Sequence, residues 1–204
     1  MKSFWRGVFS VSIVLGAVGA TPLHAQGVPG PTQDASGELL ARVLTAVAGQ
    51  PVAAAPFIER RLSALYASPL ESRGTLTFKP PGVLEKQTTS PILELVTMSA
   101  DIITIEGDQG TPRKVIKIDL QGDLAGYALG MRAILSGNAP LLRQVFDTKM
   151  TGGFDRWKLQ LLPREATLRR AIRQIVVSGA GATLRLIETT EINGDVLEMT
   201  ILPR

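Results

Sequence analysis

The fold class is decided by one stretch, Thr75-Leu76-Thr77-Phe78-Lys79-Pro80-Pro81-Gly82-Val83-Leu84-Glu85-Lys86. Apolar and polar residues alternate from Thr75 to Lys79, which predicts a strand with one buried face. Two prolines and a glycine then mark a turn, and a second apolar-rich segment begins at Val83. A strand, a short turn and another strand predict an antiparallel hairpin.

Similar short segments lie on both sides of this hairpin. Before residue 121 we expect a strand that opens at Phe57 and further strands at 75–79, 83–88, 92–98, 102–106 and 116–120. After residue 155 we expect strands at 156–162, 172–178, 183–190 and 196–202, with hairpin turns at 179–181 and at Asn193-Gly194-Asp195. Nine or ten short strands separated by Gly and Pro turns, 107–110 among them, are typical of an antiparallel meander that closes as a sandwich or barrel.

Three other segments have helical periodicity. Apolar residues recur at spacings of three and four in 34–48, and 122–136 and 140–146 are the second and third helix candidates. We expect 53–56 to be a connector and 163–169 to be a turn with some helix. Gly122, Gly126 and Gly130 fall at four-residue intervals in the second helix, where each weakens a helix by about 1 kcal/mol relative to Ala. Either they are tolerated in a plainly packed helix, or this helix is a movable lid.

The N-terminus has the pattern of a secretory signal peptide. Lys2 and Arg6 precede an apolar run from Gly7 to Ala20, and Ala25 is a small residue at the expected cleavage site. We therefore expect a removable leader at 1–25, a flexible lead-in at 26–33 and a single domain at 34–204. The expected location is the periplasm.

Composition excludes several classes of protein. The chain has 22 basic and 18 acidic residues, and loss of Lys2 and Arg6 with the leader would leave a net charge of +2. That balance argues against nucleic acid as a partner. The chain has no Cys, and its one His, His24, lies in the leader. Ser-His-Asp and Cys-His catalysis, His/Cys zinc sites and disulfides are therefore excluded from the mature chain, and we expect no cofactor, no metal and no enzyme.

Two other patterns have simple explanations. The carboxylates, among them Asp101, Glu106 and Asp108, fall mainly at expected strand ends and turns, as solvated charges do, although a hydrolase with two converging carboxyl groups is not ruled out. Lys and Arg residues spread over the strand region are expected on the wet face of an antiparallel sheet. The alternative is that one or two of them line the rim of a cavity.

The order of several motifs resembles a known family. Phe57-Ile58-Glu59-Arg60-Arg61 is followed by Gly74-Thr75-Leu76-Thr77-Phe78-Lys79-Pro80-Pro81, then by Ser90-Pro91, and later by Trp157-Lys158-Leu159-Gln160-Leu161-Leu162-Pro163. In this order and spacing, residues 36–203 resemble the periplasmic outer-membrane lipoprotein carriers of the LolA superfamily, and more closely its LolA-related branch. The chain has Glu85-Lys86 where the carrier has an Arg-Trp pair, and Ile102-Ile103-Thr104-Ile105 where it has an aromatic-rich segment. Both differences bear on the cargo.

The resemblance implies a mainly β fold with α: an incomplete antiparallel β-barrel with two or three helices packed in or over an apolar cavity. It also implies a monomeric carrier that binds the acyl chains of a lipoprotein or lipid and moves them from an inner-membrane exporter to an outer-membrane acceptor. The alternative is a non-enzymatic envelope module that binds a partner protein.

The expected lining of the cavity is drawn from the apolar positions of the strands. The candidate ligand-binding residues are Phe57, Leu76, Phe78, Leu84, Lys86, Leu93, Leu95, Ile103, Ile105, Trp157, Leu159 and Leu161. Lys86 is the candidate contact for a polar head group. The alternation of residues does not tell which strand face is concave.

Overall fold

One antiparallel sheet contains all eleven strands that the described residues form. The computed structural model describes residues 33–50, 54–80, 82–99, 102–108, 113–117 and 123–203. The strands are β1 (Ala54–Leu62), β2 (Leu70–Lys79), β3 (Val83–Ser90), β4 (Glu94–Met98), β5 (Ile102–Gly107), β6 (Lys114–Lys117), β7 (Phe146–Gly153), β8 (Arg156–Pro163), β9 (Ile172–Ala180), β10 (Thr183–Glu191) and β11 (Val196–Ile201). Some of the expected segments lie outside the described residues. These are the signal peptide, residues 26–32 of the lead-in, residues 109–110 of the expected turn, and residues 118–122 at the end of one expected strand and the start of the second expected helix.

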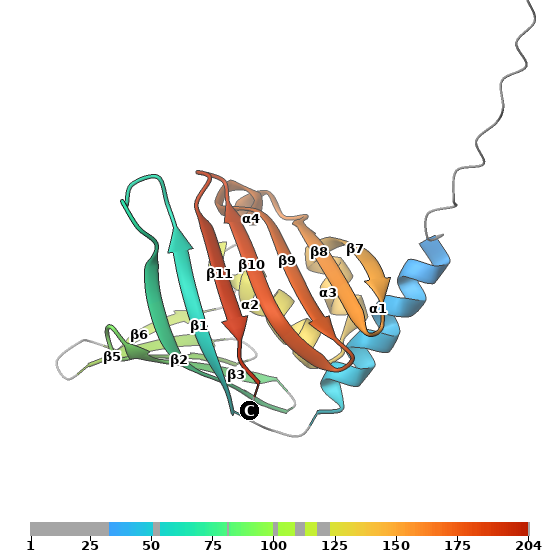
Figure 1. Ribbon diagram of the computed structural model, residues 1–204, viewed down its shortest axis with the longest axis horizontal. Coiled ribbons are helices and arrows are strands. Elements are labelled where there is room, and N and C mark those ends of the chain that lie inside the picture. Colours follow the sequence, from blue (N-terminus) through green and yellow to red (C-terminus); the bar gives the residue numbers. More distant parts are fainter. Residues whose placement is uncertain are drawn as a thin grey trace, which may run out of the picture. The chain divides into compact units, whose positions relative to one another are not determined.

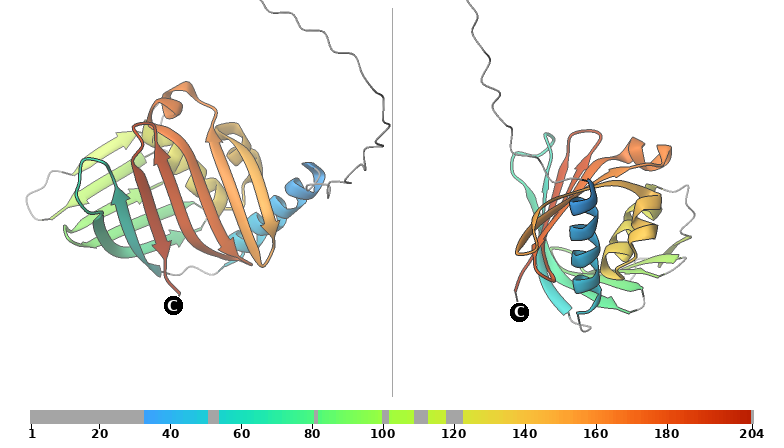
Figure 2. Two further views of the ribbon diagram at one scale, coloured as in Figure 1. Left: turned by 45° about the horizontal axis from the view of Figure 1, so that its top comes forward. Right: turned by 90° about the vertical axis from the view of Figure 1, so that its right-hand side faces the viewer.

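The order of the strands leaves the sheet open. They are arranged as β6-β5-β4-β3-β2-β1-β11-β10-β9-β8-β7, so the first and last strands of the chain are neighbours in the middle. The sheet curls around one face (Figure 2), and β6 and β7 form its two edges. The incomplete barrel is confirmed as the fold class, and the strand count of nine or ten was too low.

The helices lie on the concave side of this sheet. They are α1 (Gln33–Ala48), α2 (Asp123–Leu135), α3 (Ala139–Val145) and α4 (Ala166–Ala171), and α4 follows β8 (Figure 1). The fourth helix begins within the segment 163–169, which was expected to be a turn with some helix, and continues to Ala171. Asn138 caps α3, because its side-chain oxygen accepts a hydrogen bond from the Leu141 backbone N–H at 3.0 Å.

The register of the strands identifies the concave face, because residues paired across an antiparallel sheet point to the same side. Leu76 pairs with Ala55 on one side and with Lys86 on the other, and Phe78 pairs with Leu84. Gly74 lies opposite Phe57, where a Cβ atom would be only 2.9 Å from the phenyl ring. A side chain at position 74 would therefore clash with this ring and, more closely still, with the backbone carbonyl of Gln87.

The core fills the half of the concave face nearest β7. Trp157, Leu159 and Leu161 share one face of β8 and are no more than 2% exposed, and α1 and α3 pack over this half. The Trp157 indole Nε1–H donates a hydrogen bond to the Gly181 carbonyl at 2.9 Å. The buried polar atom at the centre of this core is therefore satisfied.

Two local expectations were wrong. No strand was expected between 146 and 153, yet this segment is β7, which pairs with β8 along its whole length. The Ser36 hydroxyl on α1 donates a hydrogen bond to the Met150 carbonyl at 3.2 Å and fixes β7 from its other side. The expected connector at 53–56 is also incorrect from Ala54 onward, because β1 begins there and pairs with β2.

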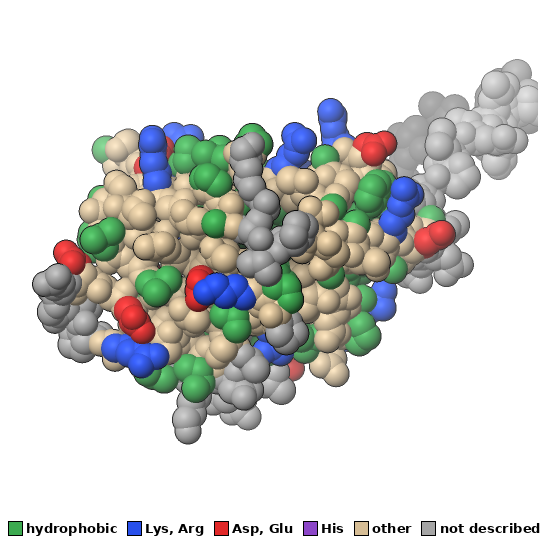
Figure 3. Space-filling model, turned by 90° about the horizontal axis from the view of Figure 1, so that it is seen from below, with side chains coloured by type: hydrophobic (Ala, Val, Ile, Leu, Met, Phe, Trp, Pro, Cys, Tyr) green, Lys and Arg blue, Asp and Glu red, His purple; other side chains and the backbone are tan. Residues whose placement is uncertain are grey.

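The charges do not gather by sign on the face of the molecule that Figure 3 shows. On the face seen in Figure 3, basic and acidic side chains are scattered among separate hydrophobic ones. Several basic residues pair with a nearby carboxylate, for example Lys79 with Glu85 at 2.7 Å and Arg164 with Asp147 at 2.7 Å. No helix in the described residues is long and apolar enough to cross a membrane.

Candidate functional site

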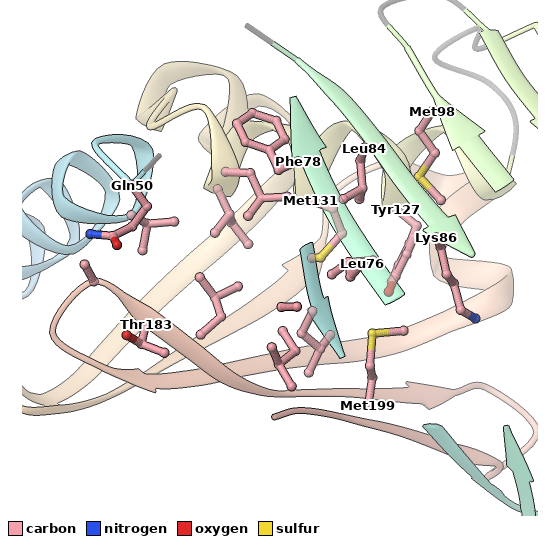
Figure 4. Close-up of a pocket in the computed structure, with 18 residues that line it drawn as sticks. Gln50, Leu76, Phe78, Leu84, Lys86, Met98, Tyr127, Met131, Thr183 and Met199 are labelled. Atoms are coloured by element: carbon pink, nitrogen blue, oxygen red, sulfur yellow. The ribbon is translucent and has the colours of Figure 1, made fainter. Parts of the chain in front are cut away.

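A cavity of about 170 Å³ lies between the sheet and α2 on the concave face (Figure 4). Its wall is mainly aliphatic, with two thioethers from the strands and one from the helix. The lining residues are Val47, Gln50, Ala55, Leu76, Phe78, Leu84, Lys86, Met98, Tyr127, Met131, Ile134, Leu135, Ala182, Thr183, Leu184, Ile187, Met199 and Ile201. We call this space the first cavity.

Helix α2 forms the roof of the first cavity. Tyr127, Met131, Ile134 and Leu135 line it and are spaced as residues on one helix face are. The other side of α2 packs against its neighbours through glycine. A Cβ on Gly130 would overlap the Phe146 ring, with Cζ only 3.1 Å away. A Cβ on Gly126 would likewise overlap Leu168 of α4. The glycines therefore bring α2 close to its neighbours.

An ion pair lies at the edge of the first cavity. The Lys86 Nζ atom is 2.7 and 2.8 Å from the two carboxylate oxygens of Glu59, and these side chains are only 20% and 12% exposed. The Ser72 hydroxyl donates a further hydrogen bond to Glu59 at 3.3 Å. The Lys86 ammonium also lies 5.4 Å from the centroid of the Phe57 ring. The charge of Lys86 is thus already balanced inside the protein.

Tyr127 projects from α2 toward this polar group. Burial raises the pKa of its phenol to about 12, and the negative charge of Glu59 acts in the same direction. A hydrogen bond with Thr189 partly opposes that rise in pKa. The phenol is therefore held in its neutral form.

A second cavity, of about 480 Å³, lies on the same concave face. Its lining residues are Arg61, Tyr127, Ala171, Ile172, Thr189, Glu191, Ile192, Asn193 and Leu197. Arg61 is 2.7 Å from a Glu191 oxygen and 3.1 Å from an Asp195 oxygen. Burial alone lowers the pKa of Arg61, but its hydrogen bonds and ion pairs with these two carboxylates outweigh that effect and raise the pKa above its ordinary value.

The structure separates the expected lining residues into three groups. Leu76, Phe78, Leu84 and Lys86 line the first cavity. Phe57, Ile103, Trp157, Leu159 and Leu161 are almost fully buried and lie outside both linings. Ile105 is half-buried beside Val96, Leu93 is half exposed in the connection after β3, and Leu95 pairs with Gln87 and so faces the convex side.

Sequence reasoning missed the contribution of the C-terminal strands and of α2. Leu184, Ile187, Met199 and Ile201 line the first cavity. The alternation of Met199 and Ile201 in β11 was visible in the sequence, whereas Leu184 and Ile187 are three residues apart and share a face because the register of β10 shifts between Leu184 and Leu186. The spacing of Tyr127 and Met131 was likewise visible. Among the described residues, no three His, Cys, Asp or Glu side chains are placed to hold a metal ion.

The sequence matches one known protein family over most of its length. Residues 34–203 match the family model described as outer membrane lipoprotein carrier protein LolA-like. The chain belongs to this LolA-like family. The family consists of carriers rather than enzymes, and no curated protein matches the sequence of this LolA-like chain.

Solved structures similar to the LolA-like chain are distant. One is a LolA superfamily protein from Nitrosomonas europaea, with 9% identity and a TM-score of 0.46, covering 82% of this chain and 91% of that one. Another is a domain assigned as an outer membrane lipoprotein-sorting protein in Vibrio parahaemolyticus, with 11% identity and a TM-score of 0.44, covering 81% and 89%.

Proposed function

We propose that this chain is a periplasmic, non-enzymatic carrier that holds an acyl chain of a lipoprotein or lipid between the sheet and α2. The observation that carries the proposal is the first cavity, because its wall is mainly apolar and lies between the sheet and one face of α2. The membership of the LolA-like family supports the same function. An inner-membrane exporter as donor and an outer-membrane acceptor are part of this proposal.

The size of the first cavity limits what it holds. A cavity of roughly 150 Å³ lined by aliphatic side chains is enough for one benzene molecule, that is, about six carbon atoms. The first cavity, at about 170 Å³, therefore admits a segment of about seven carbons. Each buried methylene contributes about 0.8 kcal/mol, so a segment of about seven carbons contributes roughly 6 kcal/mol to binding.

Lys86 remains the proposed contact for the polar group of the cargo. It lines the first cavity, and its ammonium is held at a fixed position by Glu59 at 2.7 Å. A bound polar group with a partial negative charge would share this ammonium with Glu59. Because the pair is already neutral, we expect the contact to orient a neutral head group, such as an ester or amide, rather than to attract an anion over a distance.

Native mass spectrometry of residues 26–204, isolated from periplasm without detergent, tests the carrier function. We expect an adduct that extracts into organic solvent as an acylated molecule. Leu184→Phe, which places a larger side chain in the first cavity, is expected to reduce the adduct. Leu186→Phe is the matched control, because Leu186 pairs with exposed Thr200 and so faces the convex side.

Two results would contradict the proposal. One is a protein of bare mass that takes up no lipid when lipid is offered, which would favour the envelope module that binds a partner protein. The other is an equal loss of adduct in Leu184→Phe and Leu186→Phe, which would place the lipid outside the first cavity.

A further inference from the structure

The second cavity continues the first one along the strands. On β1, Ala55 lines the first cavity and Arg61 lines the second, both on the concave face. On β11, Met199 lines the first cavity, and Leu197, two residues earlier on the same face, lines the second. On β10, Ile187 and Thr189 have the same relation. The two spaces are therefore consecutive compartments of one concave surface.

Tyr127 is the residue that the two linings share. Its ring projects from α2 toward the sheet (Figure 4). There its hydroxyl shares a hydrogen bond with Thr189 and lies near the carboxylate of Glu59. Since Thr189 lines the second cavity and Lys86 lines the first, the phenol stands at the boundary between them. One side chain thus divides the concave surface.

We infer that the two cavities form one binding channel for a single linear acyl chain, and that Tyr127 closes this channel between its two compartments in the empty protein. This inference rests on the proposed carrier function and adds a length requirement to the cargo. A chain longer than the first cavity displaces the Tyr127 ring and continues into the second cavity.

The volumes agree with a long chain. At about 25 Å³ per carbon atom, the scale of a benzene-sized cavity, the first cavity admits about seven carbons, and the second cavity, at about 480 Å³, adds a larger space that is partly open to solvent. An acyl chain of sixteen carbons exceeds the first compartment by itself and fits within the two together. A chain of eight carbons nearly fits in the first compartment alone.

The walls of the second cavity suit the continuation of such a chain. Ala171, Ile172, Ile192 and Leu197 give it an apolar wall. Its two charged members, Arg61 and Glu191, are paired with each other, and Arg61 is also paired with Asp195. An apolar chain can therefore enter without leaving a charge unpaired. The hydrogen bond that Tyr127 makes with Thr189 is the polar interaction that must be given up on opening.

The test compares two lysophosphatidylcholines, with eight and sixteen acyl carbons, titrated below their micelle concentrations into the mature protein. In Leu197→Phe, a larger side chain occupies the second cavity, and we expect about tenfold weaker binding of the sixteen-carbon probe and unchanged binding of the eight-carbon probe. Leu186→Phe on the convex face is the matched control and should leave both affinities unchanged. Circular dichroism confirms that each variant is folded.

A second variant tests the role of Tyr127. Tyr127→Phe keeps the ring and removes the hydroxyl that bonds to Thr189, so the sixteen-carbon probe should associate about fivefold faster than with the wild-type protein, and an unchanged rate would contradict the role of Tyr127. If the wild-type protein binds both probes and Leu197→Phe weakens neither or both equally, the channel is refuted while the carrier function stands. If the wild-type protein binds neither probe, the carrier function fails, and the channel with it.

Discussion

Replacement of Gly130 by Ala tests how closely α2 is held against the rest of the protein. At a solvent-exposed position inside a helix, replacing Gly by Ala raises the free energy of unfolding by about 1 kcal/mol, because Ala restricts the unfolded chain. At this position, however, the new methyl group would overlap the ring of Phe146, which is fully buried and has no room to turn aside. Overpacking of this kind destabilises by about 1–3 kcal/mol.

The net effect of Gly130→Ala is therefore a loss of up to about 2 kcal/mol in the free energy of unfolding. At roughly 2–4 °C per kcal/mol for a domain of this size, a loss of about 1 kcal/mol should lower the melting temperature by about 3 °C. Gly37→Ala is the matched control, since Gly37 lies in α1 and a Cβ there would meet nothing within 4 Å. We expect this variant to gain about 0.5–1 kcal/mol.

Urea denaturation followed by circular dichroism, on protein freed of lipid, measures both changes. The two variants carry the same substitution in two helices, so the difference between them isolates the contact with Phe146. A Gly130→Ala protein that is as stable as Gly37→Ala would refute the reasoning, because it would mean that α2 has space to move away from Phe146 without loss.

Three further predictions concern single side chains. The folded protein raises the pKa of Tyr127 from 10.0 to about 12, so the stability gained from keeping this phenol neutral is complete below pH 10 and is lost as the pH rises to about 12. The urea midpoint of the wild-type protein should fall across this range, and Tyr127→Phe should lack this part of the fall. Lys86→Met should lower the free energy of unfolding by about 2–4 kcal/mol, because it leaves the Glu59 carboxylate without its cationic partner. Adding Glu59→Gln to that variant should restore part of the lost stability, and additive losses in this double-mutant cycle would contradict the ion pair. Gly194→Ala should destabilise by about 1–2 kcal/mol because its φ is +95°, whereas Gly153→Ala meets nothing within 4 Å and should change the denaturation midpoint little; equal midpoints would count against the backbone argument.

The alternation of residues predicted most strands because each has one buried and one wet face. It failed for β7, whose sequence Phe-Asp-Thr-Lys-Met-Thr-Gly-Gly has weak strand propensity and two glycines. That segment is held by pairing with β8 and by the hydrogen bonds between Ser36 and Met150, and neither interaction is visible in a local pattern. The start of β1 was missed for the same reason, since Ala54 and Ala55 become a strand through β2.

The candidate site was predictable only in part. Leu76 and Leu159 occupy equivalent places in alternating strands, yet one lines the first cavity and the other is sealed in the core. The difference arises from which half of the sheet α1 and α3 cover, and that is a property of the tertiary packing. The pairing of Lys86 with Glu59 likewise joins two strands that are separated by β2, so spacing in the sequence could not reveal it.

The two edge strands, β6 and β7, are at opposite ends of the strand order and do not pair with each other in the described residues. A closed barrel fixes its diameter, because its width cannot change without breaking or shifting the ladder between strands. This sheet is under no such constraint. Small changes in twist, spread over many strands, can widen or narrow its interior while every backbone hydrogen bond is kept. The interior of this open sheet therefore need not have a single fixed width.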